Sequence, residues 1–121
     1  MRFLVILVMS LAAAAVSLAD ATLDANLLKI FEGKCADCHS PTKHTNDKAK
    51  KPALDGSIDL NELRQNAKEV HPGDASASKL YKVLLLDRTD KESMPHSTKA
   101  VPRDPLSPAE IKIIKQWIDG Q

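Results

Sequence analysis

The chain has 121 residues, of which 17 are Lys or Arg and 16 are Asp or Glu. This length is that of a single domain, and the balanced charge gives no basic excess that would attract nucleic acid or an anionic membrane. Only four residues are aromatic, although aromatic side chains usually dominate the area buried in a core. A small domain with so few of them is expected to need another source of buried apolar surface.

Residues 1–19 have the pattern of a signal peptide. Arg2 supplies a short positive segment, residues 3–16 are apolar apart from one serine, and small residues follow, which suits cleavage before Asp20 or two residues later. An uncleaved anchor is the weaker alternative, because the apolar run is shorter than the roughly 20 residues of a membrane-spanning helix. We therefore predict a signal peptide over 1–19 and one domain over 20–121. The protein is expected to be exported, to the periplasm or an equivalent compartment, and to be free of the membrane after cleavage.

The two cysteines of the chain, Cys35 and Cys38, are followed directly by His39. This C-x-x-C-H pattern is typical of covalent attachment of a c-type haem. Thiols three positions apart on a helical turn lie on nearly the same face, where both can bond the vinyl groups of one porphyrin while the adjacent imidazole binds the iron. We expect the other ring nitrogen of this histidine to donate to a backbone carbonyl, with that of Pro41 as the candidate acceptor. The pattern predicts one covalent haem c.

Three other chemistries could use the same cysteines. A disulfide between Cys35 and Cys38 would close too short a loop to add much stability. A thioredoxin-like redox pair belongs in an α/β context, and the sequence has no strong strand pattern. A zinc site needs four ligands; the two thiols and His44 could contribute, but the chain has no second cysteine pair and no zinc-finger spacing. The signal peptide and a suitable methionine downstream favour haem over all three.

Met94 is the candidate for the second axial ligand. It is the only methionine after residue 19, lies 55 residues after His39 and precedes Pro95, which restricts the backbone on both sides of their peptide bond. A thioether is a soft, neutral ligand for haem iron, whereas the alternative role is that of a gap-filling core methionine. Three histidines are rival ligands: His44, His71 and His96.

The apolar residues recur at helical spacing and predict an all-α domain of about four helices packed around one haem. One helix is expected over 24–33, where Gly33 either ends it or permits close approach to another helix or to the porphyrin. A capping box of Asp59 with Glu62 predicts a short helix over 60–68. A further helix is expected over 74–87, after a turn at His71-Pro72-Gly73.

The last helix has the clearest signals. Ser107 is the expected N-cap, Pro108 the first helical residue and Glu110 the partner that completes a capping box. Isoleucines and Trp117 fall on one face, and polar residues on the other. Gly120 is expected to end the helix.

The segment 40–55 is polar and reads as a loop. Its stretch from Lys43 to Lys51 holds four lysines against one aspartate. It is either a solvated loop or, close to the haem edge, a surface that attracts an acidic partner.

The chain resembles a single-haem cytochrome c, and more narrowly the planctomycete-type cytochrome c domain family. The resemblance covers about residues 22–120 and is carried by five stretches: Cys35-Ala36-Asp37-Cys38-His39, Val70-His71-Pro72-Gly73-Asp74 with residues 76–81, Ser93-Met94-Pro95, Leu106-Ser107-Pro108-Ala109-Glu110, and Trp117-Ile118-Asp119. It implies that the first and last helices pack across each other beside the haem, with His39 and Met94 as axial ligands. Where the family often has a second proline after the methionine-proline pair, this chain has His96.

These features predict a periplasmic electron carrier rather than an enzyme. Its partners are expected to be redox proteins that it meets through small, transient interfaces as a monomer. Three alternatives keep the haem and change its use: a haem-based ligand sensor, a small peroxidase-like protein, or a haem subunit of a larger redox enzyme. The resemblance also implies that such domains are often fused to larger enzymes.

Overall fold

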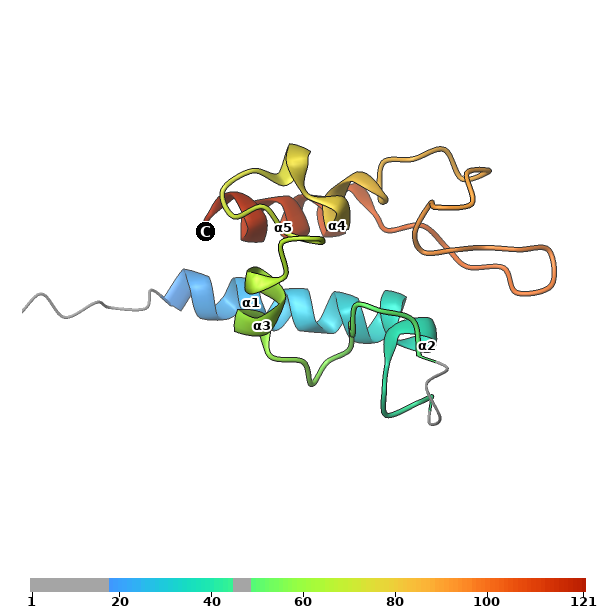
Figure 1. The fold of residues 1–121 in the computed structure, drawn as a ribbon, viewed down its shortest axis with the longest axis horizontal. Coiled ribbons are helices and arrows are strands. Elements are labelled where there is room, and N and C mark those ends of the chain that lie inside the picture. Colours follow the sequence, from blue (N-terminus) through green and yellow to red (C-terminus); the bar gives the residue numbers. More distant parts are fainter. Residues whose placement is uncertain (1–17, 45–48) are drawn as a thin grey trace, which may run out of the picture.

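The computed structural model describes residues 18–44 and 49–121. Within these ranges the chain forms helices and loops and no strand (Figure 1), which confirms the all-α prediction. The helical segments are the run 18–39, α3 (Leu60–Gln65), α4 (Lys79–Lys82) and α5 (Pro108–Asp119), with one 3-10 turn, η2 (Ala75–Ala77). The predicted signal peptide lies almost wholly outside the described residues. In the described part of the chain, no helix has both the length and the apolar character to cross a membrane.

One continuous helical run carries the cysteine motif. Helix α1 (Leu18–Ile30) passes into a π-helical turn, η1 (Phe31–Cys35), and then into α2 (Ala36–His39). The amide at the start of α2 donates to the carbonyl five residues earlier, so the following side chains are rotated by about 100° relative to an unbroken α-helix. The predicted helix end at Gly33 is therefore wrong. Close approach to another helix does not require this glycine either, because a Cβ there would meet no described protein atom within 4 Å.

Helix α3 begins where predicted and ends three residues early. Asp59 caps it by accepting the backbone amide two residues further on at 2.8 Å, and in this described segment the reciprocal bond from Glu62 is not formed. The side chain of Asn66 accepts the amide of Lys68 at 3.2 Å. This local bond competes with another helical turn, since asparagine side chains offer the backbone a non-helical partner.

The long helix predicted over 74–87 is wrong, because η2 and α4 take its place. Ser78 separates the two, with an extended backbone and a fully buried side chain. Its hydroxyl accepts the amide of His71 at 2.8 Å and so bonds back to the predicted turn, which is present, rather than continuing the helix.

The terminal helix α5 is confirmed with its caps. The hydroxyl of Ser107 accepts the amide of Glu110 at 3.2 Å, and the carboxylate of Glu110 accepts the amide of Ser107 at 2.8 Å. Pro108 is the first helical residue, and the helix ends before Gly120.

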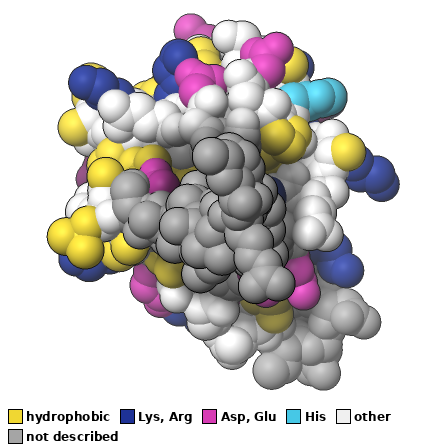
Figure 2. Space-filling model, turned by 90° about the vertical axis from the view of Figure 1, so that its left-hand side faces the viewer, with side chains coloured by type: hydrophobic (Ala, Val, Ile, Leu, Met, Phe, Trp, Pro, Cys, Tyr) yellow, Lys and Arg dark blue, Asp and Glu magenta, His cyan; other side chains and the backbone are white. Residues whose placement is uncertain are grey.

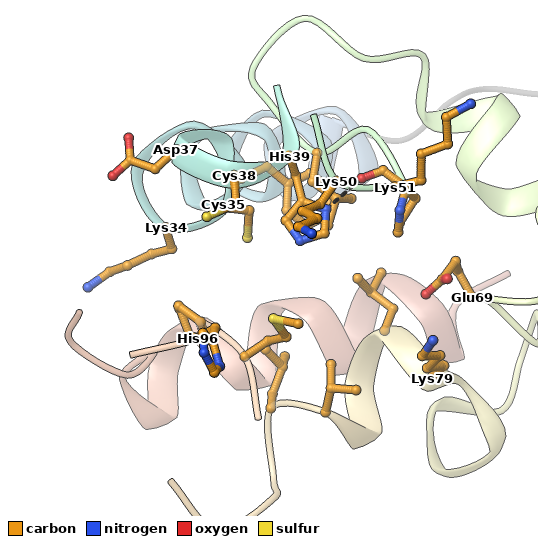
Figure 3. Close-up of a pocket in the computed structure, with 18 of the residues that line it drawn as sticks. Lys34, Cys35, Asp37, Cys38, His39, Lys50, Lys51, Glu69, Lys79 and His96 are labelled. Atoms are coloured by element: carbon orange, nitrogen blue, oxygen red, sulfur yellow. Dashed lines mark hydrogen bonds between the residues drawn. The ribbon is translucent and has the colours of Figure 1, made fainter. Parts of the chain in front are cut away.

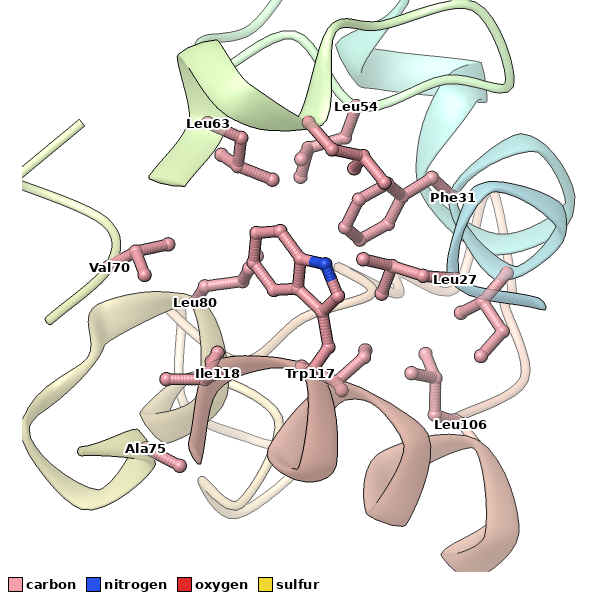
Figure 4. Packing of buried hydrophobic residues seen from close by; sticks show 13 residues of the cluster. Leu27, Phe31, Leu54, Leu63, Val70, Ala75, Leu80, Leu106, Trp117 and Ile118 are labelled. Atoms are coloured by element: carbon pink, nitrogen blue, oxygen red, sulfur yellow. The ribbon is translucent and has the colours of Figure 1, made fainter. Parts of the chain in front are cut away.

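The core joins the first and last helices around Trp117, whose indole lies among α1, α3 and α4 side chains (Figure 4). Helices α1 and α5 are in contact, as expected. The indole Nε1 donates to Asp24 of α1 at 3.0 Å. The guanidinium of Arg64, from α3, lies 5.2 Å from the centre of the ring and 3.4 Å from the same carboxylate, which adds a cation–π contact to an ion pair. These contacts hold α5, which follows the loop that contains Met94, against α1, which leads into the cysteine motif.

Candidate haem site

A cavity of about 410 Å³ lies between the cysteine motif and the α4–α5 side of the fold. Cys35, Cys38, His39 and Met94 all line it. In Figure 3, the two thiols and the imidazole project from one wall across the gap toward the wall that holds His96. The volume is in the range of small-molecule and cofactor sites. Most of the surface of the cavity is apolar, and its apolar lining residues include Phe31, Leu54, Leu80, Val83, Leu84 and Ile114.

The two cysteines are free, half-buried thiols, so they do not form the disulfide considered above. Burial raises the pKa of the Cys35 thiol to about 12, and the negative charges of Glu110 and Cys38 add to this. Redox-active thiols of the thioredoxin kind have a lowered pKa, because the thiolate is the reactive form. The environment of Cys35 therefore disfavours a thioredoxin-like pair.

The zinc alternative is not supported either. In the parts of the chain that the structure describes, no group of three or more His, Cys, Asp or Glu side chains is placed to hold a metal ion. The ring of His44, which such a site would need, instead bonds through Nε2 to the carbonyl of Asp37. His44 does not line the cavity.

His39 is held in a defined tautomer. Its Nδ1 is 2.8 Å from the carbonyl oxygen of Pro52. Because a carbonyl can only accept, Nδ1 carries the proton and Nε2 keeps its lone pair for a metal. A backbone carbonyl is the acceptor, as predicted, but Pro41 was the wrong candidate. The segment around Pro52 and Leu54, in the loop that follows α2, packs against the motif instead. The amide of Leu54 donates to the carbonyl of His39 at 3.0 Å.

A buried serine–aspartate pair fastens this loop to the end of α2, and sequence analysis missed it. Ser40 and Asp55 are 0% and 3% exposed, and the hydroxyl donates to Oδ2 of the carboxylate at 2.7 Å. The other oxygen, Oδ1, accepts the hydroxyl of Ser57 at 2.7 Å and its amide at 2.8 Å. The bonds from Ser57 and Ser40 hold the pKa of Asp55 below its usual range. A serine directly after the motif was the available signal, but its partner lies 15 residues away.

Met94 reaches the cavity from the loop between α4 and α5. It is half-buried, and its amide donates to the carbonyl of Val83 at 3.0 Å. Of the three rival histidines, His96 also lines the cavity, whereas His44 and His71 do not. The structure therefore leaves Met94 and His96 as the candidates opposite His39.

The donor set suits a haem. Two thiols, an imidazole with a free Nε2 and a thioether line one largely apolar cavity. Arg103 lines it too, and its Nε is buried without a hydrogen-bond partner among the described residues. Buried donors are normally paired. A haem, an apolar ring that bears two carboxylates, would fill the apolar space and could supply the missing acceptor.

Comparisons with known proteins identify no relative. No protein-family model matches the chain, and neither the curated proteins nor the solved structures contain a significant match. The assignment of the site consequently rests on the residues and the geometry described above.

The bonds to Asp55 predict a pH-dependent stability. The folded pKa of this group lies below its unfolded value, so its contribution is present above an unfolded pKa of about 3.9 and is lost as pH falls through the folded pKa. Asp55→Ala and Ser40→Ala are each expected to cost about 1–3 kcal/mol at pH 7 in urea unfolding. The difference between wild type and Asp55→Ala shrinks below about pH 4. Asp104→Ala, at an exposed position, is the control. An equal cost of Asp55→Ala at pH 7 and pH 3 contradicts this account.

Proposed function

We propose that this chain is an exported c-type cytochrome that carries electrons one at a time. One haem c is attached covalently through Cys35 and Cys38, with His39 and Met94 as the axial ligands. The observation that carries the proposal is that these four side chains, spread over 60 positions of the sequence, line a single cavity whose surface is largely apolar. No catalytic residue is assigned, because electron transfer needs none.

The haem, when bound, supplies the one-electron chemistry. The residues of the chain hold and tune it. Pro52 orients the ring of His39 through the bond to Nδ1 and raises the basicity of the ligand. The thioether of Met94 favours the ferrous state and therefore a higher potential than a second imidazole would. Apolar walls limit the access of water, which also bears on the potential.

The alternative functions differ in which group, if any, would bind the iron on the side opposite His39. A ligand sensor or a peroxidase-like protein needs that position to open, which requires Met94 to be absent from the iron. His96, on the same loop, is the candidate for a bis-histidine form of lower potential. A haem subunit of a larger redox enzyme would keep the same ligands and is recognised by co-purification with that enzyme.

Export fits the position of α1. Leu18 and Ala19, the two described residues that cleavage before Asp20 would remove, are both exposed. The proposed signal peptide over 1–19 would deliver the domain over 20–121 to the periplasm or an equivalent compartment, where haem can be attached to thiols. The mature protein is proposed to act as a monomer away from the membrane.

The proposed partners are redox proteins with an acidic surface. Six basic side chains line the cavity, Lys34, Lys50, Lys51, Lys79, Lys91 and Arg103, against two acidic ones, Asp37 and Glu69. The end face away from α2, seen in Figure 2, instead mixes basic and acidic side chains. A positive rim attracts an acidic partner to the edge of the cofactor and speeds association in a transient interface. Lys48, part of the lysine-rich stretch considered above, lies outside the described residues.

Replacing Met94 distinguishes an electron carrier from a haem-based ligand sensor. The wild-type holoprotein is expected to show the weak near-infrared band of thioether–ferric ligation and to ignore carbon monoxide in the ferrous state, because both axial positions are filled. Met94→His is expected to lose the band, stay six-coordinate and lower the potential in a redox titration. Met94→Ala is expected to bind carbon monoxide and gain peroxidase activity. His96→Ala, the matched control, keeps the band. A wild type that binds carbon monoxide readily contradicts the carrier proposal.

Charge reversal tests the proposed docking rim. Lys50→Glu with Lys51→Glu is expected to slow electron transfer to the native partner about tenfold or more at low salt and much less at high salt, because salt screens long-range attraction. The rates are measured by stopped flow at several ionic strengths. Lys68→Glu with Lys112→Glu, at exposed positions that do not line the cavity, makes the same change in net charge and is the control. Equal slowing at both salt levels, or by the control, argues for a solvated loop.

A further inference from the structure

The loop that joins α4 to α5 leaves the helices and returns to them as a long irregular segment (Figure 1). Arg88 spans this segment. Its Nη1 donates to the carbonyl of Pro95 at 2.7 Å and its Nη2 to the carbonyl of Arg103 at 3.0 Å. One guanidinium, near the start of the loop, is thereby bonded to two carbonyls further along it. The shorter bond is to Pro95, the residue directly after Met94.

A second arginine extends this arrangement. Arg103 donates through Nη1 to the carbonyl of His96 at 2.9 Å, and its amide donates to the hydroxyl of Ser97 at 2.9 Å. The two carbonyls that follow Met94 are thus each bound by a different guanidinium. On the other side, the amide of Met94 itself donates to Val83.

The placement of Met94 therefore depends on backbone bonds rather than on a regular element. Met94 itself is only half-buried. Long irregular loops lie at the low end of local stability and open more readily than helices. Bonds from a charged donor are shorter and stronger than neutral ones. The guanidinium of Arg88 bonds two carbonyls that are eight positions apart in this loop, those of Pro95 and Arg103.

We propose that Arg88 is a positioning residue for the axial methionine: by holding the carbonyls of Pro95 and Arg103 together, it keeps the thioether of Met94 at the iron. The inference rests on the proposed function, because it assigns Arg88 a role in a site that holds haem. Loss of these bonds raises the population in which the loop has opened and the sixth position is free. An external ligand then reaches the iron faster, although the fold and the covalent attachment are intact.

The test compares covalently loaded holoprotein of the wild type, Arg88→Met, Arg88→Lys and Lys99→Met. Lys99 is an exposed cation of the same loop, so its variant removes one charge without removing the bonds of Arg88. The readouts are the near-infrared thioether band, the rate of carbon monoxide binding to the ferrous form and the redox potential. Far-ultraviolet circular dichroism at the same temperature checks that each variant is folded.

We expect Arg88→Met to bind carbon monoxide about tenfold or more faster than the wild type, with a weaker band and a lower potential, because bonds to a charged donor are lost. Arg88→Lys keeps the positive charge, but an ammonium group lacks the planar guanidinium that bonds both carbonyls. This variant is therefore expected to recover the thioether band only in part. Lys99→Met matches the wild type. If Arg88→Met is folded and its band, potential and carbon monoxide rate equal those of Lys99→Met, the positioning role is overturned while the proposed function stands. If the wild type itself lacks the haem or the thioether band, the proposed function fails first, and the role of Arg88 fails with it.

Discussion

The hydrogen bond from Nδ1 of His39 to the carbonyl of Pro52 is the contact on which the site depends. It leaves Nε2 free and turns the ring toward the cavity. The bond exists because the loop after α2 returns over the motif, and the buried pair of Ser40 and Asp55 fastens that return. The histidine is thus oriented by contacts within the protein, as the proposed haem site requires.

The wall of the cavity opposite His39 is positioned by tertiary packing. Trp117 joins α5 to α1 through its bond to Asp24 and to α3 through the guanidinium of Arg64. This packing brings the α4–α5 loop, and Met94 with it, across from the cysteine motif. Arg88 then bonds the backbone just after Met94. Two distant parts of the chain therefore meet at one cavity, with rigid helices on one side and a tethered loop on the other.

Local signals in the sequence predicted part of this arrangement well. The caps of α5 and the helix-borne cysteine motif are read from neighbouring residues, and both appear as expected. The helix expected over 74–87 failed because Ser78 bonds to a turn seven residues earlier, and helical spacing of apolar residues does not report such a bond. The π-helical turn that ends at Cys35 was not predicted, because no sequence pattern in that segment was recognised as indicating one. The acceptor for His39, the partner of Ser40 and the contacts of Arg88 all span 7 to 15 residues through loops, where side-chain pairing cannot be read from periodicity.

The most direct test of the central claim is the mass of the exported protein. The full chain is produced in cells that attach c-type haem, isolated from the exported fraction, denatured and extracted with acid and organic solvent before intact-mass measurement. The proposal predicts a chain that lacks the signal peptide, carries the mass of one haem and has no titratable thiol, because both Cys35 and Cys38 are in thioether bonds. Cys35→Ala and Cys38→Ala are each expected to weaken that attachment. A mature wild-type chain with two free thiols and no added haem would contradict the account.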